Sequence, residues 1–156
     1  MERASIKSAR LITFILFFIY IVLTWFNFLS PIHFVKPNFV LVFISVLGFF
    51  ASDFLIFSIY SLLSIFIVKY SSFFNWEYFI LCVIAFLSFF ISKNFLYKKN
   101  HLTIGLIITL FQLLFYLLVG QVSLIFSLIF IMELVFNILL GELLFFLGLW
   151  LKKIFY

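Results

Sequence analysis

The sequence has little charge for its length. Only 10% of its 156 residues are Asp, Glu, Lys or Arg, whereas 68% are hydrophobic and the mean hydropathy is +1.41. A soluble domain is roughly 25% charged and 45–50% apolar. A soluble protein of this size has too little interior for so many large apolar side chains, so lipid must cover the remainder. The sequence therefore predicts one integral membrane domain over residues 1–156 and excludes a soluble catalytic domain.

Cysteine and glycine are also scarce, and this scarcity excludes several kinds of disulfide, metal and ligand site. The single cysteine, Cys82, allows neither a disulfide nor a cysteine metal site. His33 and His101 fall in predicted loops without a second ligand at metal spacing. Five glycines provide neither a phosphate loop nor good support for the broken helices of a transport site. We therefore expect no catalytic residue, no metal, no cofactor and no enzymatic activity.

The apolar residues form continuous runs, and this pattern favours helices over a barrel. Strands of a membrane barrel alternate apolar and polar residues, whereas the run from Leu11 to Phe28 is continuous. At about 20 residues per crossing, the chain has room for five to seven helices. We predict an all-α integral membrane protein, a bundle of about six transmembrane helices over residues 11–29, 37–50, 54–68, 77–96, 102–119 and 122–151.

Two of these boundaries leave alternatives open. Residues 37–50 and 54–68 form either two helices joined by a tight hairpin around Asp53 or one continuous bent helix. The apolar stretch 122–151 is too long for one upright helix, since 30 residues at about 1.5 Å each exceed a core of about 30 Å. Either this helix is tilted and kinked near Asn137 to Gly141, or its first part is a separate interfacial helix.

The basic residues predict an orientation for these six crossings. One side would carry Arg3, Lys7, Arg10, Lys93, Lys98, Lys99, Lys152 and Lys153, and the other only Lys36 and Lys69. By the positive-inside rule, this division places both termini in the cytoplasm. The net charge of +5 then reflects topology and attraction to anionic membrane lipid, and no basic patch indicates nucleic-acid binding.

A few polar residues interrupt the apolar spans and are the candidate functional residues. Glu133 and Asn137 are four positions apart and share one helix face, and Glu142 follows about a turn and a quarter later. Gln112 is a plausible hydrogen-bond partner for them. Two interpretations are open: a polar seam that faces a partner protein, or side chains that hold the bundle's own helices together. Both place these residues away from lipid.

The order of features resembles the rod shape-determining protein MreD family of bacteria. That family has a basic start and a first helix, followed by a proline-led second helix that opens like the run Lys36-Pro37-Asn38-Phe39-Val40-Leu41. It ends with a helix that carries an asparagine among leucines before a basic tail, which resembles Glu133 to Lys153 with Asn137 as the matching residue. The chain departs from the family at Lys69, where the family usually has an aspartate, and the glycines near that position are absent.

The resemblance implies a non-enzymatic component of the bacterial inner membrane that serves the cell-elongation machinery for peptidoglycan synthesis. Proteins of this kind associate with the membrane protein MreC and, through it, with MreB, RodA and a penicillin-binding protein. Their bundle is similar to the S-component-like fold. Pro37, Asn38, Gln112, Glu133 and Asn137 would then be residues of helix packing or partner contact.

Two other functions remain open at the level of sequence. The substrate-binding membrane subunit of an energy-coupling factor transporter is also a bundle of about six helices, and fold alone would not separate the two. Such a subunit needs a cavity with convergent polar groups, of which this chain offers few. A structural or chaperone-like subunit of another membrane complex is the third interpretation.

Overall fold

The computed structural model describes residues 2–25, 38–68, 76–94 and 100–155, with side chains in the first helix from residue 7 onward. The described residues form six α-helices and one short 3-10 helix: α1 (Glu2–Trp25), α2 (Phe39–Phe50), α3 (Phe54–Val68), α4 (Trp76–Asn94), α5 (His101–Val119), η1 (Val122–Phe126) and α6 (Leu128–Phe155). The predicted all-α class and the six helices are confirmed, whereas a membrane crossing is supported for four of the six only.

Four of the helices are long and apolar enough to cross a membrane. These spans are Lys7–Trp25, Trp76–Asn94, His101–Val119 and Leu128–Phe155. The other two helices are shorter, with 12 residues in α2 and 15 in α3. At 1.5 Å per residue, α2 is only about 18 Å long, well short of a hydrocarbon core of about 30 Å. The chain is thus a multi-pass helical membrane protein in which α2 and α3 are short apolar helices.

The first boundary differs from the prediction. Helix α1 begins at Glu2 and not at Leu11, because the basic opening segment contains no glycine or proline and continues the helix of the apolar run. Residues 26–29, predicted to end this helix, lie outside the described part, and so does Pro37, predicted to begin the next one. Helix α2 begins at Phe39, with Asn38 as its N-cap.

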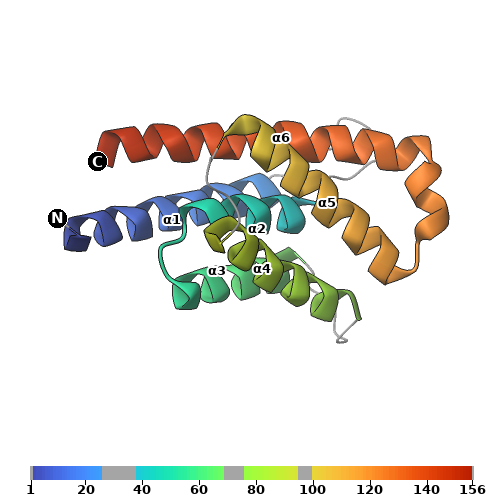
Figure 1. The fold of residues 1–156 in the computed structure, drawn as a ribbon, viewed down its shortest axis with the longest axis horizontal. Coiled ribbons are helices and arrows are strands. Elements are labelled where there is room, and N and C mark those ends of the chain that lie inside the picture. Colours follow the sequence, from blue (N-terminus) through green and yellow to red (C-terminus); the bar gives the residue numbers. More distant parts are fainter. Residues whose placement is uncertain (1, 26–37, 69–75, 95–99, 156) are drawn as a thin grey trace.

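The hairpin around Asp53 is confirmed, and the continuous bent helix over residues 37–68 is wrong. Ala51 adopts an extended conformation, with φ −62° and ψ 128°, so helix α2 ends there. Helix α3 then begins at Phe54. The chain turns within three residues, Ala51 to Asp53, and the two helices run back along each other (Figure 1).

The long apolar stretch near the C-terminus is divided at its start. Gly120, in the left-handed region with φ 81°, is the C-cap that ends α5. A 3-10 turn, η1, follows, and α6 then runs without interruption through Asn137 to Gly141. The first part of the stretch is therefore a separate element, although it is a 3-10 turn and not an α-helix.

Helix α2 occupies the centre of the bundle (Figure 1). Every residue from Val40 to Phe49 is buried, and α2 contacts α1, α3, α4, α5 and α6. Such burial fits its composition, because a helix that is apolar on all sides has no face suited to water. Most side chains of the longer helices point outward instead, since only 28–39% of each spanning window is buried. Large exposed side chains such as Leu55, Phe86 and Leu106 give the outer surface its apolar character.

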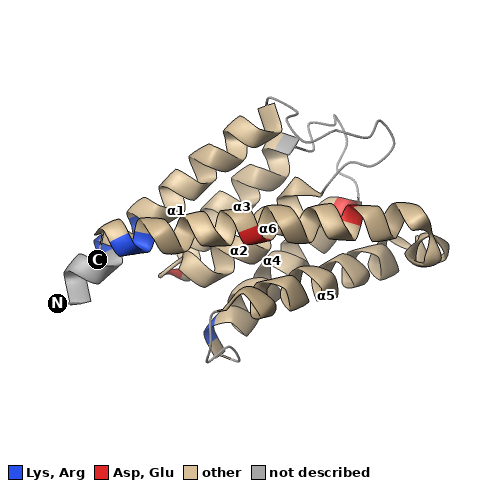
Figure 2. Cartoon of the chain, turned by 90° about the horizontal axis from the view of Figure 1, so that it is seen from above, with Lys and Arg blue, Asp and Glu red and all other residues tan. Residues whose placement is uncertain are grey.

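The two ends of the chain lie at the same end of the bundle, since α1 begins where α6 finishes (Figures 1 and 2). Figure 2 shows that the described Lys and Arg positions lie toward that end of the ribbon. They are Lys7, Arg10, Lys93, Lys152 and Lys153. The remaining members of the predicted division, Arg3, Lys36, Lys69, Lys98 and Lys99, lie outside the described side chains. We refer to this end as the basic end.

Candidate functional site

A group of polar side chains lies in the core between α2, α5 and α6. It consists of Asn38, Gln112, Tyr116, Glu133 and Asn137, and we call it the polar seam. Gln112 and Asn137 are completely buried, and Glu133 is only 8% exposed. Polar groups at such depth in a membrane protein need partners inside the protein, because hydrocarbon provides none.

Asn137 connects three helices through its amide. Its Oδ1 accepts a hydrogen bond from the backbone N–H of Asn38 at 2.9 Å, and its Nδ2 donates to Oε1 of Gln112, also at 2.9 Å. The Asn38 side chain in turn accepts from the N–H of Leu41 at 3.2 Å, which caps α2. The first N–H groups of a helix have no partner within the helix. The seam therefore supplies acceptors for two backbone N–H groups at the start of the central helix, those of Asn38 and Leu41.

Glu133 is bonded inside the bundle as well. The hydroxyl of Tyr116 donates a hydrogen bond to Oε2 of Glu133, which joins α5 to α6. The ring of Phe130 on α6 packs edge-on against the ring of Tyr116, with ring centroids 5.0 Å apart. Among the residues that the structure describes, Nε2 of Gln112 has no hydrogen-bond partner, although it is buried.

The structure brings together most of the residues singled out in the sequence. Asn137 and Glu133 share the inward face of α6, and the expected hydrogen bond between Gln112 and the seam is present. Tyr116 was missed, although its position four residues after Gln112 on the same face could have indicated it. Glu142 does not belong to the seam, since its carboxylate pairs with Nδ1 of His101.

A second set of polar contacts lies at the basic end. Arg10 forms an ion pair with Asp53 at 3.0 Å, and Nζ of Lys93 donates to the carbonyl oxygen of Ala51. The predicted loop position of His101 is wrong, because Asn100 caps α5 and makes His101 its first helical residue. Within the described side chains, no group of three or more His, Cys, Asp or Glu could hold a metal ion.

Small residues bring α2 and α4 into close contact. The hydroxyl of Ser88 donates to the carbonyl of Ile44 at 3.2 Å, and that of Ser92 donates to the carbonyl of Gly48 at 2.7 Å. A Cβ atom at Gly48 would lie 2.9 Å from Oγ of Ser88. Gly48 thus permits a helix approach that lets two serines bond to backbone carbonyls of the central helix.

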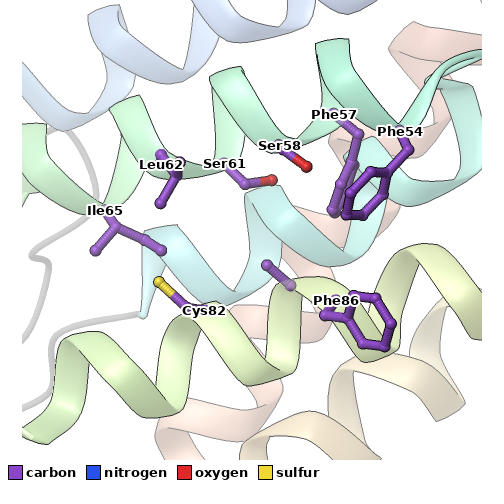
Figure 3. A pocket seen from close by; sticks show the side chains of 9 residues that line it. Phe54, Phe57, Ser58, Ser61, Leu62, Ile65, Cys82 and Phe86 are labelled. Atoms are coloured by element: carbon purple, nitrogen blue, oxygen red, sulfur yellow. The ribbon is translucent and has the colours of Figure 1, made fainter.

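Helices α3 and α4 leave a groove on the outer side of the bundle, which we call the α3–α4 groove (Figure 3). It encloses about 130 Å³, and its lining includes Phe57, Ser58, Ser61, Cys82 and Ala85. Ser61 is one of the lining residues, and within the described part of the chain its oxygen is buried without a hydrogen-bond partner.

No family model, no curated relative and no solved structure matches the chain. The class that the sequence and structure support by themselves is a helical multi-pass membrane protein, with four long apolar helices around a short central one.

Proposed function

We propose that the chain is a non-enzymatic component of the bacterial cell-elongation machinery, similar to MreD, in the inner membrane with both termini in the cytoplasm. One observation carries the proposal. Asn38 and Asn137 belong to the two sequence segments on which the resemblance to MreD rests, and a hydrogen bond joins them across 99 positions of sequence. The two segments therefore share one structural role, which is to join α2 to α6. The first supplies the donor of the hydrogen bond, and the second supplies the acceptor.

The bonding of the polar seam further supports a scaffold. Gln112, Tyr116, Glu133 and Asn137 bond across helix interfaces, so they hold α5 and α6 to each other and to the start of α2. Polar contacts of this kind stabilise helix association in membranes. A rigid bundle with an apolar outer surface is suited to presenting fixed helix faces to partner proteins.

The test is co-purification from a rod-shaped bacterium. The full chain, tagged and solubilised in mild detergent, should retain an MreC-type membrane protein and, through it, MreB, RodA and a penicillin-binding protein. A second unrelated multi-pass protein with the same tag serves as the control. The proposal fails if the chain inserts and folds but retains none of these partners.

The Glu133→Leu variant distinguishes the two roles considered for the seam. It should insert into the membrane, because leucine is apolar, and it should weaken partner association if Glu133 helps to shape the partner surface. Unchanged association would leave Glu133 as a residue of internal packing, which its bond to Tyr116 already provides.

A second candidate is the substrate-binding subunit of an energy-coupling factor transporter. The observation that favours it is Nε2 of Gln112, a buried donor for which the described residues provide no partner. It lies in the same polar seam as Asn38, the N-cap of α2. Buried helix N-termini attract anionic groups of solutes in transporters. Mass spectrometry of the protein purified under native conditions would detect a retained vitamin-sized solute. Its presence, and its loss in Gln112→Leu, would favour the transporter.

A further inference from the structure

We propose that the outer surface of α3 and α4 selects phospholipids with short acyl chains and thins the bilayer on that side of the bundle. This surface, which we call the α3–α4 face, consists of exposed apolar side chains that include Leu55, Ile59, Leu63, Phe79 and Phe90. Lipid binding at this face needs no protein partner and is independent of the elongation function proposed above.

The uncharged parts of α3 and α4 are equally short. Helix α3 has 15 residues, Phe54–Val68, and in the sequence these lie between Asp53 and Lys69. Helix α4 is longer as a whole, yet only 15 of its residues lie between Glu77 in its first turn and Lys93 in its last. At about 1.5 Å per residue, 15 residues extend about 22 Å. The hydrocarbon core of a typical bilayer is about 30 Å thick, so both uncharged parts fall about 8 Å short of it.

The two short segments lie side by side, so neither extends the other. Phe66 of α3 stacks on Tyr78 of α4, with ring centroids 6.2 Å apart. Near the other end, Phe54 of α3 meets Phe89 of α4, with ring centroids 5.4 Å apart. Helix α3 therefore begins beside the last turns of α4 and ends beside its first turns. Both helices present lipid with one apolar surface of the same height, about 22 Å.

Contacts within the bundle fix the charged residues at the basic end of the α3–α4 face. Arg10 forms its ion pair with Asp53, and Nζ of Lys93 donates to the carbonyl oxygen of Ala51. A helix that is too short for a bilayer can gain height when flanking Lys or Arg side chains stretch toward water. Arg10 and Lys93 are instead held at the hairpin between α2 and α3. A thinner bilayer is then the adjustment that lipid itself can make.

Helix α6 provides a contrast, because it lies on the opposite side of the bundle (Figure 1). Leu128 to Leu151 of this helix extend about 36 Å, which exceeds the hydrocarbon core. Its two carboxylates in this stretch bond to α5, through Tyr116 and His101. A helix longer than the core is accommodated by tilt. The bilayer must therefore thin beside α3 and α4 but not beside α6.

The length of the acyl chains decides the cost of this thinning. Lipids with shorter chains form a thinner hydrocarbon core, so they cover a short apolar surface with less deformation. The exposed side chains of α3, such as Leu55, Ile59 and Leu63, offer lipid only apolar contact. Chain length is then the property by which the α3–α4 face distinguishes one phosphatidylcholine from another.

Tryptophan fluorescence can measure the preference at each face of the full-length protein. The three tryptophans, Trp25, Trp76 and Trp150, are all exposed, and replacing them by phenylalanine leaves a chain without tryptophan. Ile59→Trp then places one reporter on the exposed side of α3, and Leu139→Trp places one on the exposed side of α6. Each variant is reconstituted in brominated dioleoylphosphatidylcholine, which quenches tryptophan, together with an unbrominated phosphatidylcholine that competes with it.

The two reporters should show different preferences. At Ile59→Trp, we expect dimyristoleoylphosphatidylcholine, with short chains, to displace the brominated lipid about two- to fivefold more effectively than dierucoylphosphatidylcholine, with long chains. At Leu139→Trp, this ratio should be near one or lower. Leu63→Trp repeats the measurement on α3 if Ile59→Trp fails to fold, since Leu63 is also exposed there.

A substitution at the end of the face tests the cause of the preference. Lys93→Leu removes the charge that ends the uncharged part of α4, so the preference at Ile59→Trp should move toward longer chains. Lys93→Arg is the matched control and should leave the preference unchanged, because it keeps the charge at the same position.

Three results would overturn the inference: equal ratios at the two reporters, stronger binding of the long-chain lipid at Ile59→Trp, or an unchanged preference in Lys93→Leu. Absence of quenching at Ile59→Trp in every lipid mixture would overturn it as well, because a second copy of the chain would then cover the face in place of lipid. Retention of an MreC-type protein is measured on the wild-type chain by co-purification. That result decides the proposed function alone, whichever lipid the α3–α4 face prefers.

Discussion

The backbone N–H of Asn38 lies 2.9 Å from Oδ1 of Asn137, and this hydrogen bond joins the start of the central helix to the middle of the last one. The same asparagine binds Gln112 on α5 through its other amide atom. A single side chain therefore links the three helices that enclose the polar seam. The consequence is that residues remote in sequence depend on one another for their hydrogen bonds.

Replacing Asn137 by leucine should destabilise the bundle by about 1–3 kcal/mol, because it leaves the Asn38 N–H and the Gln112 carbonyl oxygen buried without partners. The free energy of unfolding, measured by titrating dodecyl sulfate into mixed micelles, would show the loss. Leu139→Ala is the control, since Leu139 is 61% exposed on the outer face of α6 and should matter little. Equal stability of the two variants would mean that the amide contributes no net stabilisation.

The bond between Tyr116 and Glu133 should appear as coupling between their substitutions. Tyr116→Phe removes only the hydroxyl and should cost about 0.5–2 kcal/mol. Glu133→Gln keeps an acceptor oxygen and should cost less than Glu133→Leu. In the double variant with Tyr116→Phe and Glu133→Leu, the losses should be smaller than their sum, because both remove the same bond. Strict additivity would contradict a direct interaction.

Gly48→Ala should weaken the contact between α2 and α4. The added Cβ would lie 2.9 Å from Oγ of Ser88 and 3.2 Å from Oγ of Ser92, and moving these hydroxyls breaks their bonds to the central helix. We expect a loss of about 1–3 kcal/mol in the same unfolding measurement. Gly105→Ala is the matched control, because the nearest atoms there are 3.9 Å away and alanine is the better helix former. If Gly48→Ala left the free energy of unfolding unchanged, α2 and α4 could move apart without a loss of stability.

The sequence predicts those parts of the fold that depend on local pattern. The six helices follow from continuous apolar runs, and the hairpin at Asp53 follows from the only charged residue between two such runs. The bond between Gln112 and Asn137 could be anticipated because buried amides need partners. These predictions require only that polar groups avoid hydrocarbon.

What the sequence could not predict depends on packing between distant segments. The burial of α2 on every side is one case, because an apolar helix in a membrane protein can face lipid as well as protein. The Arg10–Asp53 ion pair and the contact of Ser92 with Gly48 need the arrangement of the helices in space. The predicted beginning of α1 at Leu11 is too late, because the basic residues before it continue the helix and limit only its apolar part.

The Arg10–Asp53 ion pair should contribute little to stability, in contrast to the buried seam. Both side chains are more than a third exposed, and pairs of this kind contribute about 0–1 kcal/mol. Asp53→Asn should therefore change the free energy of unfolding by less than the loss expected for Asn137→Leu, and the small effect should shrink as salt is added. A loss as large as that of Asn137→Leu would indicate that Asp53 has a further structural role.

The basic end should face the cytoplasm, and cysteine labelling can test this in intact cells. Cys82→Ser removes the only cysteine of the sequence. Gln121→Cys, between α5 and η1, and Lys152→Cys, in the last turn of α6, each add one exposed cysteine at opposite ends of the bundle. Because cytoplasmic loops carry the excess of Lys and Arg, an impermeant maleimide should label position 121 from outside and position 152 only after the membrane is broken. Leu139→Cys, on the outer face of α6, is the control that neither condition should label. The opposite pattern at positions 121 and 152 would invert the proposed orientation and place the basic end outside the cell.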